Sequence, residues 1–177
     1  LLSRGLGDVY KRQDMPSKLN TQPPNTPPKY QDQINNDPET YAVYYSPNED
    51  KLKTTYYDRY YSNGYDSNLF LCDNASYYYL SFLGSDDLIA HIKTNAKTGR
   101  NLVVIKESYG NGLIPFFTES FDNIYVLDLR YCEVNAIKFC KQVDATDLLF
   151  ANCAYTIAGG NCDYFSYCLL YTSPSPR

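Results

Sequence analysis

The chain has 177 residues, enough for one domain with a sizeable core, and its 20 acidic and 16 basic side chains give a net charge of −4. Because contacts to phosphate need clustered Lys or Arg, this balance argues against a nucleic-acid partner. No apolar run reaches the roughly 18 residues of a membrane-spanning helix, so a membrane anchor would have to lie upstream.

Both ends of the chain read as translated sequencing adapter. Residues 3–13 (SRGLGDVYKRQ) can be encoded by one strand of a transposon-type adapter, and residues 168–177 (CLLYTSPSPR) by the complementary strand in a shifted frame. We therefore expect residues 1–13 and 168–177 to be artefacts that flank a natural fragment open at both ends. The alternative is a genuine arm that carries Lys11 and Arg12.

Residues 14–38 are rich in Pro, Asn, Gln and Thr, a composition that predicts an extended linker or an insertion. The β-prone runs at 39–46 (ETYAVYYS) and 51–58 (KLKTTYYD), separated by PNED, predict a Tyr-rich β-hairpin. The next residues, 59–68, are predicted to form a loop. Paired tyrosines in such runs usually pack across strands, although exposed rings also suit stacking on sugars.

The C-terminal half alternates strand and helix. Residues 88–94 (LIAHIKT) predict a strand, and they are followed by strand, helix, strand, helix and strand patterns at 101–106, 110–120, 123–128, 133–142 and 146–151. Nearly continuous apolar strands between helices predict an α/β fold with a parallel sheet. The fold class expected is a partial SGNH or flavodoxin-like sheet, to which the Tyr-rich hairpin region is added.

Polar residues follow each of the three strands. The first strand is followed by Glu107-Ser108-Tyr109-Gly110-Asn111, the second by Asp128 and Arg130, and the third by Asn152. Ligands of open α/β sheets bind beyond the carboxyl ends of the strands. The pattern therefore predicts a cleft that contains Ser108, Arg130 and Asn152.

Ser108 is the candidate nucleophile of this cleft. A serine needs a base, usually a histidine held by a carboxylate, and an oxyanion site, which amides at the start of a helix can supply. The alternative is a serine that merely ends a strand and caps a helix, because the first glycine of G-x-S-x-G is missing. The only histidine, His91, falls within a predicted strand, so the base is expected from outside this chain.

The cysteines do not indicate a site. Without Cys168 an odd number is left, no CxxC occurs and there is one histidine, so neither a disulfide framework nor a zinc site is predicted. We expect no metal or other cofactor, and free thiols at Cys72, Cys132, Cys140, Cys153 and Cys162.

Residues 76–152 resemble the C-terminal part of the bacterial DHHW protein family. The most specific matches are Phe-Leu-Gly at 82–84, Ile-Lys-Thr at 92–94, VIKESYGN at 104–111, Pro-Phe at 115–116 and DLRY at 128–131. The family is similar to SGNH-type serine esterases, which include enzymes that O-acetylate cell-envelope polysaccharides. The resemblance makes residues 39–167 a partial domain of this kind.

The resemblance also implies roles for particular residues. Ser108 is the implied nucleophile and the turn of Tyr109, Gly110 and Asn111 the oxyanion site, while Asp and His come from an upstream Asp-His-His-Trp motif. The chain departs from the family at Glu107, where Asp is usual, and at residues 85–88, where Gly-Asn-His-Pro is common. A substrate-binding role for Arg130 and Asn152 rests on their strand-end positions, where a cation suits an anionic sugar.

The expected function is that of a bacterial, extracytoplasmic serine O-acyltransferase or esterase. It would move an acyl group from a donor to carbohydrate through acyl-Ser108, and the present chain would be inactive without the upstream Asp and His. A second reading is a non-catalytic envelope protein that binds glycans through its tyrosines. A third, an intact cytosolic enzyme that uses His91, is the least favoured.

Overall fold

The computed structural model describes residues 11–14, 42–45, 49–70, 82–84 and 89–159. The chain divides into two compact units, residues 1–47 and 48–177. In the first unit, β1 (Lys11–Asp14) and β2 (Ala42–Tyr45) pair antiparallel. The predicted linker from residue 15 onward, Cys72, Cys162, residues 85–88 and the second adapter-like segment lie outside the described residues.

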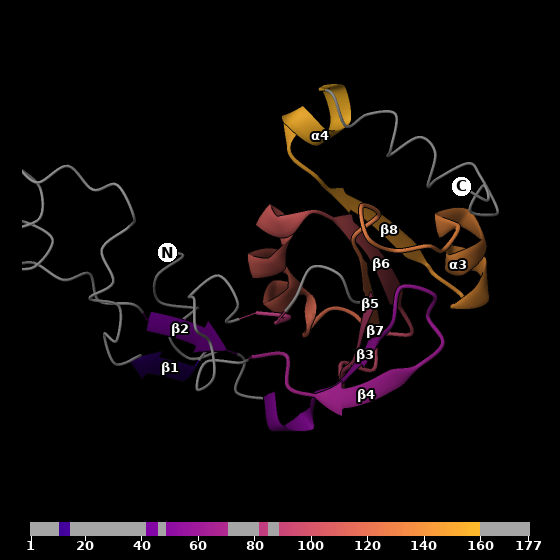
Figure 1. Ribbon diagram of the computed structural model, residues 1–177. Helices are drawn as coiled ribbons and strands as arrows, with labels where there is room; N and C mark the ends of the chain where they lie inside the picture. The colour runs from indigo at the N-terminus through magenta and orange to yellow at the C-terminus, as the bar shows by residue number, and fades with distance from the viewer. Residues whose placement is uncertain (1–10, 15–41, 46–48, 71–81, 85–88, 160–177) are drawn as a thin grey trace, which may run out of the picture. The chain divides into compact units, whose positions relative to one another are not determined.

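The second unit is built on a six-stranded sheet with the order β4-β3-β5-β7-β6-β8 (Figure 1). Its strands are β3 (Lys53–Tyr57), β4 (Gly64–Ser67), β5 (Ile89–Lys93), β6 (Asn101–Lys106), β7 (Asn123–Leu127) and β8 (Asp147–Ala151). β7, β6 and β8 are parallel, whereas β4, β3, β5 and β7 pair antiparallel. The predicted α/β fold is confirmed, with antiparallel strands making up half of the sheet.

Short helices follow the three parallel strands. The 3₁₀ helix η3 (Ser108–Phe117) follows β6, α3 (Ala136–Gln142) follows β7, and α4 (Ala154–Ala158) follows β8. Figure 1 shows η3 and α3 on opposite sides of the sheet. Asn135 begins α3 as a side-chain cap, because its Oδ1 accepts a hydrogen bond from the Lys138 amide at 2.8 Å.

The Tyr-rich hairpin forms from different strands than predicted. β2 pairs with β1, and β3 pairs with β4, which arises from residues expected to be a loop. A further 3₁₀ turn, η1 (Glu49–Lys51), precedes β3. The prediction that tyrosines pack across strands is confirmed, because Tyr56 and Tyr65 are register partners with stacked rings 5.8 Å apart.

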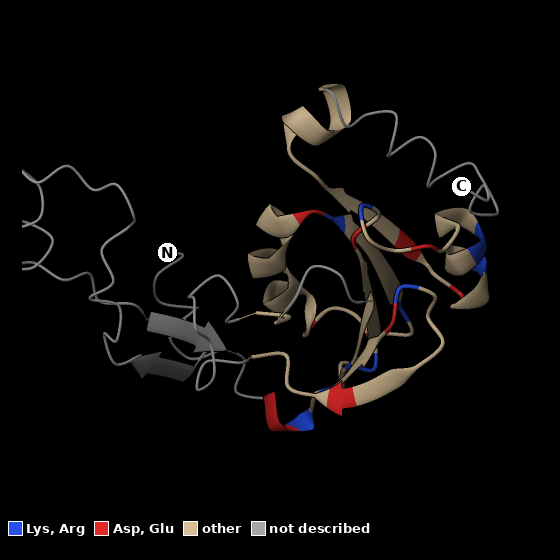
Figure 2. Ribbon diagram, viewed as in Figure 1, with Lys and Arg blue, Asp and Glu red and all other residues tan. Residues whose placement is uncertain are grey.

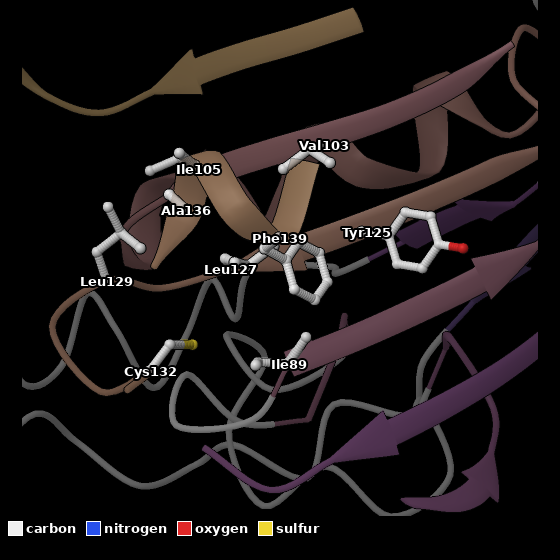
Figure 3. Packing of buried hydrophobic residues seen from close by; sticks show 9 residues of the cluster. All are labelled: Ile89, Val103, Ile105, Tyr125, Leu127, Leu129, Cys132, Ala136 and Phe139. Carbon is white, nitrogen blue, oxygen red and sulfur yellow. The ribbon is translucent and has the colours of Figure 1, made fainter. Parts of the chain in front are cut away.

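The core lies on both faces of the parallel strands. On β6, Leu102 to Lys106 are all buried, as expected for a strand covered by helices on both sides. Figure 3 shows the cluster between α3 and the sheet, which consists of Ile89, Val103, Ile105, Tyr125, Leu127, Leu129, Cys132, Ala136 and Phe139. This packing fixes β6 and β7, and with them the residues that follow each strand.

Candidate functional site at the carboxyl ends of β6, β7 and β8

The strand register brings the predicted residues to one edge of the sheet. Lys106 is paired with Ala151 of β8 and Ile105 with Leu127 of β7, so each strand ends at the same level as its neighbour. Figure 2 shows charged segments of both signs at the junction between β6 and η3. The strand ends thus lie at one edge of the sheet, and a cleft that contains Ser108, Arg130 and Asn152 stays a prediction.

Ser108 is the first residue of η3 and is partly exposed. The first backbone bond of the helix runs from the Gly110 amide to the Glu107 carbonyl at 2.9 Å. The Gly110 amide is therefore engaged, and in a 3₁₀ helix the amides of Ser108 and Tyr109 come before the first intrahelical bond. The predicted oxyanion site at Tyr109, Gly110 and Asn111 stays a prediction.

The other side chains of the predicted oxyanion turn differ in exposure. The Tyr109 ring is 83% exposed, whereas Asn111 is buried. Gly110 packs closely, because a Cβ added to it would lie 2.6 Å from Cβ of Lys106 and 3.3 Å from the Ala151 carbonyl oxygen. Only glycine thus lets η3 begin this close to β6 and β8.

Glu107 makes three polar contacts in the site, which the sequence did not predict. Its carboxylate is 5% exposed and accepts hydrogen bonds from the Cys153 amide at 2.7 Å, the Cys153 thiol at 3.3 Å and the Thr156 hydroxyl. Burial raises the pKa of Glu107, but these bonds and the charge of Arg130 outweigh it and lower the pKa below its ordinary value.

Arg130 is held by Asp128, two residues before it. Its Nε and Nη2 donate to the two Asp128 carboxylate oxygens at 2.9 and 2.5 Å, and Lys106 Nζ lies 3.7 Å from the same carboxylate. Asp128 and Lys106 are 1% and 2% exposed, whereas a third of the Arg130 side chain is exposed. Arg130 therefore belongs to a buried ion-pair network while part of its side chain is exposed to solvent.

Asn152 follows β8 directly and stands level with Glu107 by the strand register. Its side-chain oxygen is buried and has no hydrogen-bond partner among the described residues. A substrate-binding role for Arg130 and Asn152 stays a prediction.

His91 is not part of the site. It lies in β5 and pairs with Tyr125 of β7, which in turn pairs with Val103 of β6. The end of β6 is therefore two strands away from His91 across the sheet and three residues further along the strand direction. At about 3.3 Å per residue and about 4.8 Å per strand, the separation exceeds about 10 Å. The prediction that His91 lies within a strand, away from Ser108, is confirmed.

The His91 ring has structural partners instead. It stacks on Tyr125 with centroids 4.3 Å apart, and its Nε2 lies 3.0 Å from Asn123 Oδ1. Because the Asn123 amide nitrogen donates to Asn101 Oδ1 at 2.8 Å, the Asn123 oxygen faces the imidazole and Nε2 is the donor. Burial lowers the pKa of His91.

Cys132, Cys140 and Cys153 are free thiols, as predicted. Within the described ranges, no group of three or more His, Cys, Asp or Glu side chains gathers as a metal site. In the same part of the chain, every helix is too short or too polar to cross a bilayer.

Comparison with known proteins identifies relatives of this chain. The sequence pattern that defines the DHHW protein family matches residues 8–127, more than half of the chain and including Ser108. The match begins earlier than the resemblance recognised in residues 76–152. A crystal structure of a DHHW family protein from Eubacterium siraeum is 32% identical, with a TM-score of 0.75 over 93% of this chain and 55% of that one.

Two structures of PatB1 from Bacillus cereus share the fold. One, described with a sulfonyl adduct, is 18% identical with a TM-score of 0.64, over 89% of this chain and 51% of that chain. The other is 17% identical with a TM-score of 0.63, over 87% and 52%. No curated protein sequence matches. The chain thus spans about half the length of these solved structures.

Proposed function

The chain belongs to the DHHW protein family, and from this premise we propose that it carries the nucleophile of a serine O-acyltransferase or esterase that acts on cell-envelope carbohydrate. The observation that carries the proposal is the place of Ser108. It is the first residue of η3, directly beyond an interior strand of the parallel part of the sheet. Open α/β sheets bind their ligands there.

The proposed reaction has two steps. A base takes the Ser108 hydroxyl proton, Oγ attacks the acyl carbonyl of the donor, and the tetrahedral oxyanion is held by the amides of Ser108 and Tyr109. The donor's leaving group departs with the proton and acyl-Ser108 remains. A sugar hydroxyl, or water in an esterase, then attacks the acyl group and releases Ser108 as the free hydroxyl.

In the proposed mechanism the base comes from outside the present chain. The sequence has a single histidine, which is fixed in β5, more than about 10 Å from the end of β6. We assign the base and its carboxylate partner to the Asp-His-His-Trp motif that gives the family its name. The present chain is then inactive by itself, and the complete protein acts outside the cytoplasm, at the envelope.

Two features support covalent chemistry on carbohydrate. The PatB1 structure with a sulfonyl adduct has this fold, and sulfonyl groups attach to nucleophilic side chains such as serine. Next to Ser108, the exposed Tyr109 ring offers an aromatic face on which a sugar can stack.

Labelling with a fluorophosphonate tests the proposal. In a longer chain that includes the upstream motif, we expect labelling that is lost in Ser108→Ala and kept in Ser120→Ala, which removes an exposed serine beyond η3. The 177-residue chain should remain unlabelled. Labelling that survives Ser108→Ala would exclude Ser108 as the nucleophile.

A non-catalytic glycan-binding role is the second candidate. It is favoured by Tyr60 and Tyr65 in the hairpin region, whose side chains are more than half exposed. Calorimetric titration with envelope oligosaccharides separates the two functions. Binding that Tyr65→Ala abolishes, together with no labelling of the longer chain, would favour the binding protein over the enzyme.

A further inference from the structure

We propose that Glu107 is a positioning residue for Ser108, and that its carboxylate ties the start of η3 to the start of α4. This inference rests on the proposed function, because it concerns the same serine. We call the contacts of Glu107 with Cys153 and Thr156 the Glu107 clasp. They link two segments 46 to 49 residues apart in the sequence.

The clasp joins residues that are immediate neighbours of the site. Glu107 directly precedes Ser108, and Cys153 directly follows Asn152. Both Glu107 oxygens are used: Oε1 accepts from the Cys153 amide, and Oε2 accepts from the Cys153 thiol and the Thr156 hydroxyl. The carboxylate thus connects the residue before Ser108 with the residue after Asn152. If the backbone at Ser108 or at Asn152 shifts, a hydrogen bond to the carboxylate has to break.

The clasp is not an ordinary helix cap of η3. Glu107 occupies the N-cap position of η3, yet its side chain makes no capping hydrogen bond to that helix. Instead it crosses to Cys153, the N-cap residue of α4. The buried carboxylate does not cap its own helix and instead accepts hydrogen bonds from three donors at the start of α4. It therefore connects two elements of the fold and does not stabilise η3 as a cap.

Burial raises the pKa of Glu107, but the hydrogen bonds from Thr156 and Cys153, with a smaller contribution from the charge of Arg130, lower it and keep the carboxylate ionised. Among the residues that the structure describes, the titratable group that contacts this carboxylate from the β8–α4 side is the partly buried Cys153 thiol. Hydrogen bonds to an ionised carboxylate are stronger than neutral ones. The clasp is therefore fully formed at neutral pH.

Thr156→Val tests the clasp in the 177-residue chain, because it removes one buried donor with little change of shape. We expect amide hydrogen exchange at Gly110, whose amide donates to the Glu107 carbonyl, to accelerate about tenfold, as for the loss of one hydrogen bond to a charged group, with exchange in β5 unchanged. Thr156→Ser keeps the hydroxyl and should restore the slow exchange.

Thr118→Val is the matched control. Thr118 is also buried, and its hydroxyl donates to the Pro115 carbonyl at 2.8 Å, at the other end of η3. The control should leave the Gly110 amide protected. If both valine variants accelerate exchange there equally, or if Thr156→Val leaves it unchanged, the clasp does not position Ser108.

A second measurement uses the longer chain that carries the upstream motif. The rate of fluorophosphonate labelling of Ser108 should fall about tenfold in Thr156→Val and return in Thr156→Ser. Unchanged labelling in Thr156→Val would overturn the positioning role. If the wild-type longer chain is not labelled at all, the proposed function fails, and the exchange experiment still decides whether the clasp holds the Ser108 turn.

Discussion

Two glycines of η3, Gly110 and Gly112, occupy opposite environments. A Cβ added at position 110 would lie 2.6 Å from Cβ of Lys106, and a change of rotamer cannot move that atom. A Cβ added at position 112 would have no neighbour within 4 Å. Gly110→Ala is therefore expected to cost about 1–3 kcal/mol in the free energy of unfolding, as overpacking does. Gly112→Ala should be neutral or stabilise by up to about 1 kcal/mol.

Urea unfolding of both variants measures the difference. Equal stabilities for the two variants would show that η3 does not need its close approach to β6 and β8. From the sequence, Gly110 is expected in the oxyanion turn that the family resemblance implies, and its close packing is not predicted. Its contact with Lys106 and Ala151 depends on the register of β6 with β8, which one sequence does not reveal.

Among the elements, the parallel half of the sheet was predictable, whereas in the antiparallel half β3 and β5 were predicted as strands but β4 and the strand pairing were not. β6, β7 and β8 are apolar runs separated by helical patterns, and this alternation has few other solutions. For β2 and β3 the short PNED segment favoured a hairpin, but β2 pairs with β1 and β3 with β4. The pairing of β1 with β2 joins segments far apart in the sequence, and the turn from β3 to β4 lies where a loop was expected, so the PNED signal alone does not identify the partners.

The turn between β3 and β4 depends on Asp58, which the sequence did not single out. Its carboxylate accepts bonds from the amides of Ser62 at 2.9 Å, Tyr60 at 3.1 Å and Asn63 at 3.3 Å, and also from the Ser62 hydroxyl. These bonds, that from the Ser62 amide above all, hold the pKa of Asp58 well below its ordinary value. The carboxylate thus organises the whole turn as an acceptor.

Asp58→Ala should open this hairpin locally. We expect the amides of Tyr61 and of β4 to exchange faster, because the backbone bond from Tyr61 to the Asp58 carbonyl closes the same turn. Exchange in β7 should not change. The control is Asp50→Ala, which removes an exposed carboxylate in η1. If the amides of β4 exchange faster in the control as well, Asp58 has no specific role in the turn.

For the whole molecule, titration predicts that acid destabilises the fold in two stages. Hydrogen bonds and ion pairs, such as that of Asp147 with Arg100, lower the pKa of several carboxylates, so their stabilisation is present above about pH 4 and is lost as the pH falls through the lower folded values. His91 acts at higher pH. Burial lowers its folded pKa below the ordinary 6.5, so stability already declines as the pH falls through that value.

His91→Phe should remove the first stage and leave the second. The phenyl ring can keep the stack on Tyr125, but it loses the bond to Asn123, so the variant is expected to be less stable by about 1 kcal/mol at neutral pH. The measurement is therefore the decrease in the urea midpoint of unfolding from about pH 7 to pH 5. This decrease should be smaller in His91→Phe than in the wild-type protein. Protonation of His91 and of the carboxylates both destabilise the fold as the pH falls. If the urea midpoint declines equally in the wild-type protein and in His91→Phe, the carboxylates alone cause the acid destabilisation and His91 is not desolvated in the sheet.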